Sequence, residues 1–581
     1  MARPPAERPP VTLATSRLEE MSKNERLKVD SRALFLVASR EPHPFRDEVE
    51  ELTRGERVTL SNEAKELSKF FGVYRQQARG ERGRKTDDHF FMVRIRNPGG
   101  GRLTAAQWVA LDEAADLHGD GTLRITSRQG LQYHRVYGPH LAPLIRHLNR
   151  GYRDRATLGA CGDVNRNVMV SPIDDLDPVH EVRGRELAEA IAEELAPKTS
   201  AYFEIWLTDE AGRKLGPVNP EEPLYGLHYL PRKFKIGIGH PEENSIDVLT
   251  QDVGLVPVVR DGRADGESFD LYSGGGLGMT HNMPITAPYL GLYHGRIRRD
   301  EVVPAVLAIA ILQRDHGERK DRRRARWKYT LRRLGLDAVN RELRSRFKIE
   351  LEDGDPQPLG PMRLHLGWHE QRGGGHYYGL HVENGRLAGA RRRAVREAVE
   401  QLGLEVRLTP QQDLLLLGVR DRAALEGILA RHGIAGPEGV SRVRANAMAC
   451  PAKPTCGLAM TEAETILPSY IDAIEEAGLG DVDAVIRMTG CPNMCARPPT
   501  AEIGIYGYGK NDHVILVGGS REGTRLGHVL FPRLPEEQMR PALVGLFRAI
   551  REHCPPGRAV GDFLHETDPE TLRGWIGLGD G

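Results

Sequence analysis

A repeated eight-residue segment is the feature that most constrains the fold of this 581-residue chain. The segment RITSRQGL, residues 124–131, is echoed by RLTPQQDL at residues 407–414. Each copy follows a stretch with helical patterning, residues 105–117 and 391–402, and glycine-rich turns recur later in each half, at 274–276 and 518–519. Chance similarity is the competing interpretation, but the matching flanks favour a duplicated folding unit.

Local patterns divide the chain further. A strand pattern begins at His89, ends at Asn97-Pro98, and is followed by a helical stretch and a second strand at 122–126, which is an α+β arrangement. Residues 352–361, EDGDPQPLGP, predict a linker between the halves. The first 20 or so residues are Pro-rich and polar, which predicts a flexible arm. We expect an N-terminal arm at 1–85, a first half-domain at 86–155, a first α/β domain at 156–350, a linker with the second half-domain at 351–440, and a second α/β domain with the C-terminal tail at 441–581.

Composition excludes several classes of protein. The 81 basic residues balance the 81 acidic ones, which gives no support to a nucleic-acid or membrane-surface role. The longest apolar run, Val302–Leu312, is shorter than the ~20 residues that span a bilayer, and the N-terminus lacks an apolar signal region. We therefore expect a soluble cytoplasmic protein with no nucleic-acid or membrane partner.

Four of the six cysteines lie close together in the sequence. Cys450 and Cys456 form a C-x5-C pair, and Cys491 and Cys495 form a C-x3-C pair. Four thiolates can ligate a [4Fe-4S] cluster. A zinc ion is the alternative to the cluster, although structural zinc sites usually have C-x2-4-C spacing and lack a helical insertion such as residues 462–477. Cys554 has no predicted role.

Basic residues recur in short strand-like segments. In a strand, alternate residues share a face, so Arg94 and Arg96 are expected on one face, as are Lys233 and Lys235. For any single residue a solvated strand face is the more common arrangement. Together with the cysteines, the balance reverses, and the basic segments favour cations that converge on one cavity.

The segments MACPAKPTC and TGCPNMCARP resemble the cluster motif of the siroheme-containing sulfite and nitrite reductases, and the resemblance runs from about Phe71 to Leu526. It implies an α+β, pseudo-two-fold duplicated architecture with two ferredoxin-like half-domains and two siroheme- and cluster-binding α/β domains. It also implies two cofactors, siroheme and a [4Fe-4S] cluster, with Cys495 bridging the cluster to the siroheme iron as its proximal ligand.

The same resemblance implies roles for individual residues. Those matching the substrate-binding positions are Arg94, Arg166, Lys233 and Lys235. Those matching positions around the siroheme are Arg124, Thr126, Arg128, Gln132, His134, Arg232, Arg326 and Asn493. In a subset of the family a cysteine is joined to a tyrosine near the haem, and Cys161 and Tyr74 match those positions. An unlinked buried thiol is the alternative for Cys161.

Lys235 bears on the choice of substrate, because ferredoxin-dependent nitrite reductases commonly have Asn at the matching position. The resemblance therefore favours an assimilatory-type sulfite reductase, which converts sulfite to sulfide with six electrons. Reduction of nitrite to ammonia is the alternative. A non-enzymatic zinc- and RNA-binding module is the remote one, since aromatic residues that could stack on bases make up only 6% of the chain.

The sequence contains no flavin or nicotinamide module, because GGGLGM at 274–279 does not match the G-x-G-x-x-G spacing. Electrons are expected from a partner, either ferredoxin or an NADPH flavoprotein subunit. The basic run Arg319–Arg326 could dock an acidic ferredoxin, although such runs more often form a solvated helix face.

Overall fold

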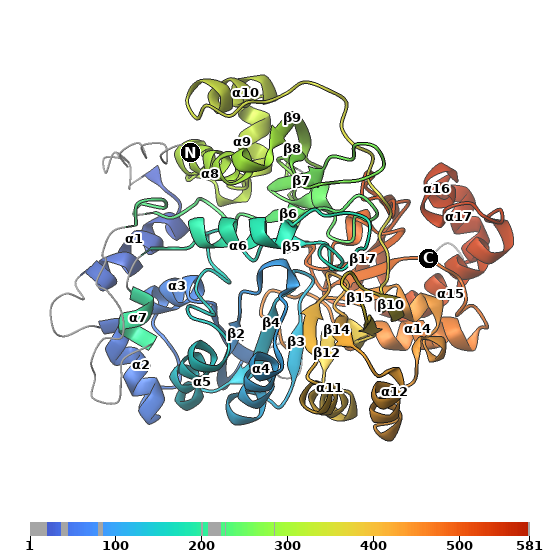
Figure 1. The fold of residues 1–581 in the computed structure, drawn as a ribbon, viewed down its shortest axis with the longest axis horizontal. Coiled ribbons are helices and arrows are strands. Elements are labelled where there is room, and N and C mark those ends of the chain that lie inside the picture. Colours follow the sequence, from blue (N-terminus) through green and yellow to red (C-terminus); the bar gives the residue numbers. More distant parts are fainter. Residues whose placement is uncertain are drawn as a thin grey trace.

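The computed structural model describes residues 20–36, 44–79, 85–198, 201–206, 222–226, 228–283 and 285–578. Nearly all of the predicted Pro-rich arm lies outside the described residues. Two antiparallel sheets and two mixed sheets form the body of the molecule (Figure 1). In Figure 1 the antiparallel sheets lie in the lower half, and the mixed sheets lie above and to the right.

The two antiparallel sheets belong to half-domains with the same order of elements. The first comprises β1 (Val73–Arg79), β2 (Lys85–Arg94), α4 (Ala105–His118), β3 (Leu123–Ile125), β4 (Leu131–Val136) and α5 (Gly138–Gly151). The second comprises β10 (Gly367–Glu370), β11 (His376–Leu380), α11 (Gly389–Leu402), β13 (Glu405–Leu408), β14 (Leu414–Val419) and α12 (Arg422–Arg431). The sheet orders β1-β2-β4-β3 and β10-β11-β14-β13 correspond strand for strand, which confirms the predicted duplication. β1 lies within the range predicted for the N-terminal arm and pairs with β2.

The half-domains are joined by reciprocal contacts between the repeated segments. β12 (Arg386–Leu387), from the second half, pairs with β3 and extends the first sheet. Gln129 donates a hydrogen bond from Nε2 to the carbonyl oxygen of Leu408 (3.3 Å), and Gln412 donates in the same way to Ile125 (3.4 Å). Gln129 and Leu408 correspond to Gln412 and Ile125 in the repeat, so these contacts describe a pseudo-two-fold relation.

The two mixed sheets repeat each other as well. The first has β5 (Met169–Val170), β6 (Ile236–Ile238), β7 (Val253–Pro257), β8 (Ser268–Ser273) and β9 (Leu292–Arg298), and the second has β15 (Ala447–Ala449), β16 (Ile486–Thr489), β17 (Ile503–Gly509), β18 (Asp512–Val517) and β19 (His528–Pro535). In both, the first two strand pairs are parallel and the last two antiparallel. The two glycine-rich turns follow β8 and β18, at corresponding places.

Helices cover the sheets. They are α1 (Lys23–Leu36), α2 (Pro44–Arg54), α3 (Asn62–Phe70), α6 (Gly184–Glu194), α7 (Ala201–Trp206), α8 (Arg299–His316), α9 (Trp327–Leu334), α10 (Leu336–Ser345), α13 (Arg442–Ala445), α14 (Leu467–Glu476), α15 (Glu536–His553), α16 (Val560–Glu566) and α17 (Pro569–Ile576). The helix predicted at 462–477 is confirmed in part, since α14 begins at Leu467. Residues 353–366, which include most of the predicted linker, contain neither helix nor strand.

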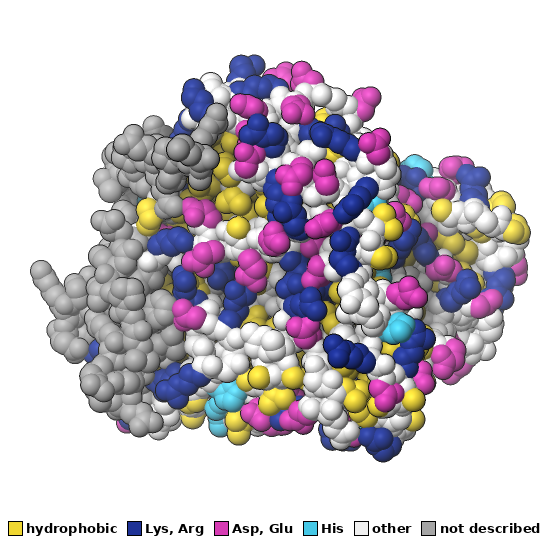
Figure 2. All heavy atoms as spheres, viewed as in Figure 1, with side chains coloured by type: hydrophobic (Ala, Val, Ile, Leu, Met, Phe, Trp, Pro, Cys, Tyr) yellow, Lys and Arg dark blue, Asp and Glu magenta, His cyan; other side chains and the backbone are white. Residues whose placement is uncertain are grey.

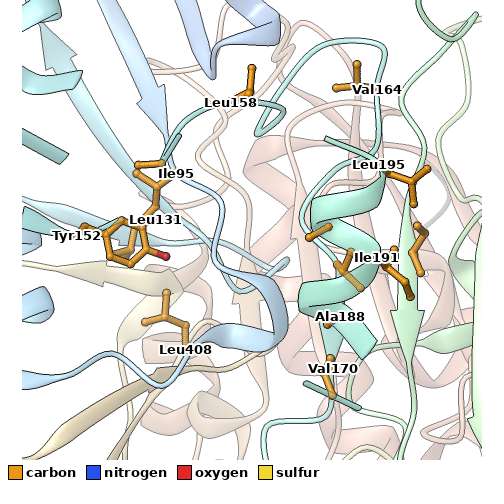
Figure 3. Packing of buried hydrophobic residues seen from close by; sticks show 14 of the residues in the cluster. Ile95, Leu131, Tyr152, Leu158, Val164, Val170, Ala188, Ile191, Leu195 and Leu408 are labelled. Carbon is orange, nitrogen blue, oxygen red and sulfur yellow. The ribbon is translucent and has the colours of Figure 1, made fainter. Parts of the chain in front are cut away.

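Two main hydrophobic cores hold these units. The larger core includes residues of both half-domains and of the first mixed unit, and Figure 3 shows Leu131 and Leu408 on one side of it and Ile191 of α6 on the other. The second mixed unit has its own core, with Ile486 and Phe547 among its members. Over the described residues, the helices are too short or too polar for any of them to cross a bilayer. On the face drawn in Figure 2, basic and acidic side chains are interspersed, as the balanced composition predicts.

Candidate redox centre

The four cysteines are brought together by two parallel strands. β15 and β16 are neighbours, with Ala449 paired to Met488, and Cys450 directly follows β15 while Cys491 lies two residues after β16. The carboxyl ends of adjacent parallel strands meet at one edge of a sheet, where such sheets bind their ligands. Cys456 and Cys495 lie in the loops that leave this edge, so all four thiols gather there.

The thiols lie near enough to influence one another. Burial and the neighbouring Cys495 raise the pKa of the Cys450 thiol, and the same causes raise the pKa of Cys491 to about 11. The described residues contain no group of three or more His, Cys, Asp or Glu side chains placed to hold a single metal ion. In a [4Fe-4S] cluster each thiolate binds a different iron, so the sulfurs stand apart. Four thiolates gathered at one edge of a sheet therefore fit the donor set of such a cluster.

Cys495 differs from the other three cysteines in its exposure. Cys450 and Cys491 are buried and Cys456 is partly buried, whereas Cys495 is exposed. Ser127 of the first half-domain donates a hydrogen bond from Oγ to the Cys495 carbonyl oxygen (2.8 Å). Cys495 therefore lies where the second mixed unit meets the first half-domain, and its thiol remains accessible to a second group.

A row of polar side chains crosses the first half-domain next to this place. Arg94 of β2 and Arg124 of β3 are both register partners of Gln132 of β4. In the amide orientation that hydrogen bonding favours, the Gln132 oxygen accepts from Arg94 Nη2 (2.6 Å) and Nε (3.2 Å). Arg94 Nη1 also donates to Cys161 Sγ (3.3 Å), and Arg124 pairs with Glu464 (2.7 Å).

His134 supplies the test of whether a cofactor fits here. It follows Gln132 on the same face of β4 and is only 3% exposed, yet neither ring nitrogen has a hydrogen-bond partner among the residues that the structure describes. Burial and the surrounding Arg386 and Arg124 lower the pKa of His134, so the ring stays neutral. A buried imidazole without partners is costly. The orphaned nitrogens, with arginines around them, fit a polyanionic macrocycle such as siroheme.

Two lysines reach the same region from the first mixed unit. Lys233 and Lys235 flank the fully buried Phe234 and lie just before β6, so their side chains share a face, as predicted. Burial and Arg232 lower the pKa of Lys233 to about 7, and burial and Lys233 lower that of Lys235. Across the described residues, neither Nζ forms a hydrogen bond or an ion pair with the protein. An anion bound between them would supply the missing partner.

Other predicted residues surround these lysines. Arg166 lies beside them, since its amide donates to the Phe234 carbonyl (2.8 Å), and Arg232 lies 3.8 Å from Asp163. Arg128 donates to the Gln251 side chain (2.7 Å), and Arg326 pairs with Asp252 (2.8 Å).

Two of the predicted site residues, Thr126 and Asn493, form hydrogen bonds within their own loops. Thr126 Oγ1 accepts from the amides of Arg128 (3.3 Å) and Gly130 (3.1 Å), so it shapes the turn of the repeated segment. Asn493 donates from Nδ2 to Cys491 Sγ (3.4 Å), a contact of the kind that tunes iron–sulfur clusters.

The expectation that Arg96 shares a face with Arg94 is wrong. β2 ends at Arg94, so the alternation of faces stops there, and Arg96 Nη1 donates instead to the Ala192 carbonyl at the end of α6 (3.0 Å). Arg96 lies among Arg153, Glu193 and their neighbours, away from the cysteines.

Sequence reasoning missed several residues of the site. Ser127, Glu464 and Asp252 contact Cys495, Arg124 and Arg326 respectively. Ser127 had a usable signal, because it lies inside the repeated segment. The glycine-rich loop GGGLGM, which fails as a nucleotide motif, packs on the cysteine loop, where the Met279 amide donates to the Pro492 carbonyl (2.8 Å).

Comparisons with known proteins agree with this geometry. Residues 161–351 match the family description "Nitrite and sulphite reductase 4Fe-4S domain", and residues 82–151 and 369–431 match "Nitrite/Sulfite reductase ferredoxin-like half domain". The chain is 38% identical to the NADPH sulfite reductase hemoprotein beta-component of Chromohalobacter salexigens, covering 94% of this chain and 96% of that protein. It is 37% identical to the ferredoxin sulfite reductase of Synechococcus elongatus, covering 96% and 91%. The structure of the Mycobacterium tuberculosis NirA protein has a similar fold, with a TM-score of 0.76 at 22% identity, over 93% of this chain and 96% of that one.

Proposed function

The chain belongs to the family of nitrite and sulfite reductases, and on that premise we propose that it is the subunit that reduces sulfite to sulfide with six electrons. Membership of the family confirms the predicted fold and the predicted cofactors, siroheme and a [4Fe-4S] cluster. The observation that carries the proposal is the position of Lys233 and Lys235, two side chains near enough to Cys495 for its thiol to affect their pKa values, with no hydrogen-bond or ion-pair partner for either Nζ among the described residues.

The residues have distinct proposed roles. Cys450, Cys456, Cys491 and Cys495 would hold the cluster, and Cys495 would also reach the siroheme iron. Residues around His134 and Arg128 would bind the siroheme carboxylates, since guanidinium groups match carboxylates in geometry and charge. The cofactors, when bound, supply the electron transfer.

Substrate binding is the proposed role of Arg94, Arg166, Lys233 and Lys235. These cations would neutralise the sulfite dianion and orient its oxygens. The lysines can also donate protons, because a pKa of about 7 for Lys233 suits proton transfer near neutral pH. Each oxygen that leaves as water requires two protons, so a pair of ammonium groups beside the substrate matches the demand of the reaction.

Electrons would come from a separate protein. The two relatives named above carry NADPH and ferredoxin in their names, so both kinds of donor occur among close relatives of this chain.

Purified protein supplied with a reduced viologen dye tests the proposal. We expect an absorption spectrum typical of haem and iron–sulfur groups, sulfide as the product from sulfite, and slower formation of ammonia from nitrite. Ammonia from nitrite without sulfide from sulfite would make the chain a nitrite reductase. A colourless protein would contradict the cofactor assignment.

A further inference from the structure

Helix α1 carries two buried charges that the proposed reaction does not use. Lys28 is fully buried and Glu25 is 1% exposed, although both lie near the N-terminus and α1 contains no residue of the predicted site. Their charged atoms lie 2.6 Å apart. Burying an ion pair costs several kcal/mol per ion unless further partners offset the loss of water, so these residues need partners in the body of the protein.

The partners belong to the segment that carries the active-site lysines. Lys28 Nζ donates to the Leu230 carbonyl (2.9 Å) and lies 3.3 Å from Asp163 Oδ2. Glu25 binds Arg319 (2.6 Å), whose Nη2 donates to the Tyr229 carbonyl (2.8 Å). α1 therefore contacts the Leu230 carbonyl directly and reaches the Tyr229 carbonyl through Arg319.

Asp163 continues the connection into the site. It pairs with Arg322 (2.9 Å) and lies 3.8 Å from Arg232, a predicted siroheme contact. Its backbone carbonyl accepts from the Leu230 amide (2.9 Å). Burial opposes ionisation, but Arg322, Lys28 and Arg232 together hold the pKa of Asp163 well below its usual range. Arg319 and Arg322 belong to the basic run considered for ferredoxin docking, and the structure uses both of them inside the protein.

The other end of the segment is fixed by different contacts. The Phe234 amide donates to the Val164 carbonyl (3.0 Å), and the Lys235 amide donates to Asp252 Oδ2 (2.9 Å). Lys233 and Lys235 thus lie between a clamp formed by the core and a clamp formed by α1. Because Tyr229 has a φ of +55°, the segment begins in a conformation that needs such support.

We propose that Lys28, together with Glu25, is a positioning residue for the sulfite site. α1 fixes the Tyr229–Leu230 end of the lysine segment. Through Lys28, it also determines how strongly the Asp163 carboxylate interacts with Arg232. This inference rests on the proposed function for its meaning, but the contacts themselves do not depend on the identity of the substrate.

The test compares Lys28→Met with Lys23→Met, a matched control, since Lys23 is an exposed lysine on the same helix. Hydrogen–deuterium exchange of the holoenzyme reports directly on the segment, because the Leu230, Phe234 and Lys235 amides are hydrogen bonded, and we expect them to exchange slowly in the wild type. We expect the peptide covering 229–235 to exchange about tenfold faster in Lys28→Met and unchanged in Lys23→Met.

The kinetic expectation is specific to positioning. The KM for sulfite should rise about tenfold in Lys28→Met, with cofactor absorbance per protein unchanged. Unchanged exchange at 229–235 and an unchanged KM in a fully loaded Lys28→Met enzyme would overturn the inference. If Lys28→Met does not load cofactors, Glu25→Gln serves instead, because it weakens the Arg319 link while Lys28 stays in place, and the same two readings decide. A wild type that forms no sulfide would refute the proposed function, whereas the exchange result would stand.

Discussion

The two half-domains share a backbone but differ in what they place on it. In the first, the row Arg94–Gln132–Arg124 crosses the sheet and His134 follows on the same face. In the second, the register partners of Leu415 are Gly379 and Arg407, and Leu417 stands where His134 stands in the first. Arg124 and Arg407 are retained in both copies, but the polar positions of Gln132 and His134 are apolar in the second copy.

Packing explains the second arrangement. Leu415 and Leu417 form a small apolar cluster with Ile173, Leu176 and Tyr377. At Gly379 the His365 backbone comes so near that a Cβ would lie 1.5 Å from its carbonyl oxygen. The linker and the apolar cluster thus occupy the place that corresponds to the proposed siroheme site on the first half-domain. Duplication supplied two scaffolds, and side chains at matching positions made one a proposed site and the other part of a core.

The mixed units differ in a similar way. The second carries thiols at the carboxyl ends of β15 and β16, and the first carries cations just before β6. We expect the thiols to make the larger contribution to activity.

Cys495→Ser tests the contribution of the thiols and should abolish activity, because a serine hydroxyl is a poor iron ligand and both cofactors would lose a shared sulfur. Iron content, labile sulfide and the visible spectrum would check it. Cys554→Ser is the control and should not change activity, because Cys554 lies far from the site in sequence, at the edge of the second core, and its thiol donates to the Pro555 and Arg558 carbonyls. A Cys495→Ser protein with coupled siroheme and an intact cluster would disprove the bridging role.

Exchanging residues between the half-domains would test the comparison itself. Leu417→His places a polar ring in the apolar cluster and should cost about 3–5 kcal/mol, seen as a lower midpoint of thermal unfolding. Leu417→Met, which conserves volume, should cost less than about 1.5 kcal/mol. The reverse change, His134→Leu, should leave the apo protein stable but reduce siroheme content. If His134→Leu retained full siroheme and Leu417→His were harmless, the polar and apolar difference would have no functional meaning.

The sequence revealed the duplication because residues that contact each other across the pseudo-two-fold axis are of the same type in both copies. Gln129 and Gln412 make reciprocal bonds, so each copy constrains the other. The cysteines were recognisable because cluster ligation requires a particular residue type in short spacing. Glu464 could not be found, since its partner Arg124 lies 340 residues away and only the fold brings them together. Arg96 was misplaced for a related reason, because the end of β2 is set by tertiary contacts.

Substrate preference should depend on one cation of the first mixed unit. Lys235→Asn removes a charge beside Lys233 and should lower kcat/KM for sulfite about 100-fold, the scale of losing one donor to a developing anion, with a smaller loss for nitrite. Lys510→Asn, at an exposed lysine, is the matched control. Sulfide and ammonia assays on the same preparations give the ratio. Equal losses on both substrates would show that Lys235 does not select between them.

The smallest effect is expected at Tyr74 and Cys161. Both belong to the surroundings of Arg94, and Arg94 Nη1 lies 3.3 Å from Cys161 Sγ. A thioether would join the Cys161 sulfur to a ring carbon of Tyr74, with the two electrons and two protons that are lost passing to an external oxidant such as dioxygen. It would tie β1 to the segment that leads to Arg166. Because Arg94 remains held by Gln132 in either case, Tyr74→Phe should change activity only about twofold.

Peptide mapping by mass spectrometry separates the two states of this pair. A linked peptide containing Tyr74 and Cys161, lighter by two hydrogen atoms than the sum of its parts, is expected in the wild type and absent from Tyr74→Phe and Cys161→Ala. Unlinked wild-type peptides would leave Cys161 as a buried thiol. Arg94 would then be held by two uncharged neighbours, Gln132 and the Cys161 thiol. In the first half of the chain a thiol would position a cation, whereas in the second half the thiols are proposed to hold metal.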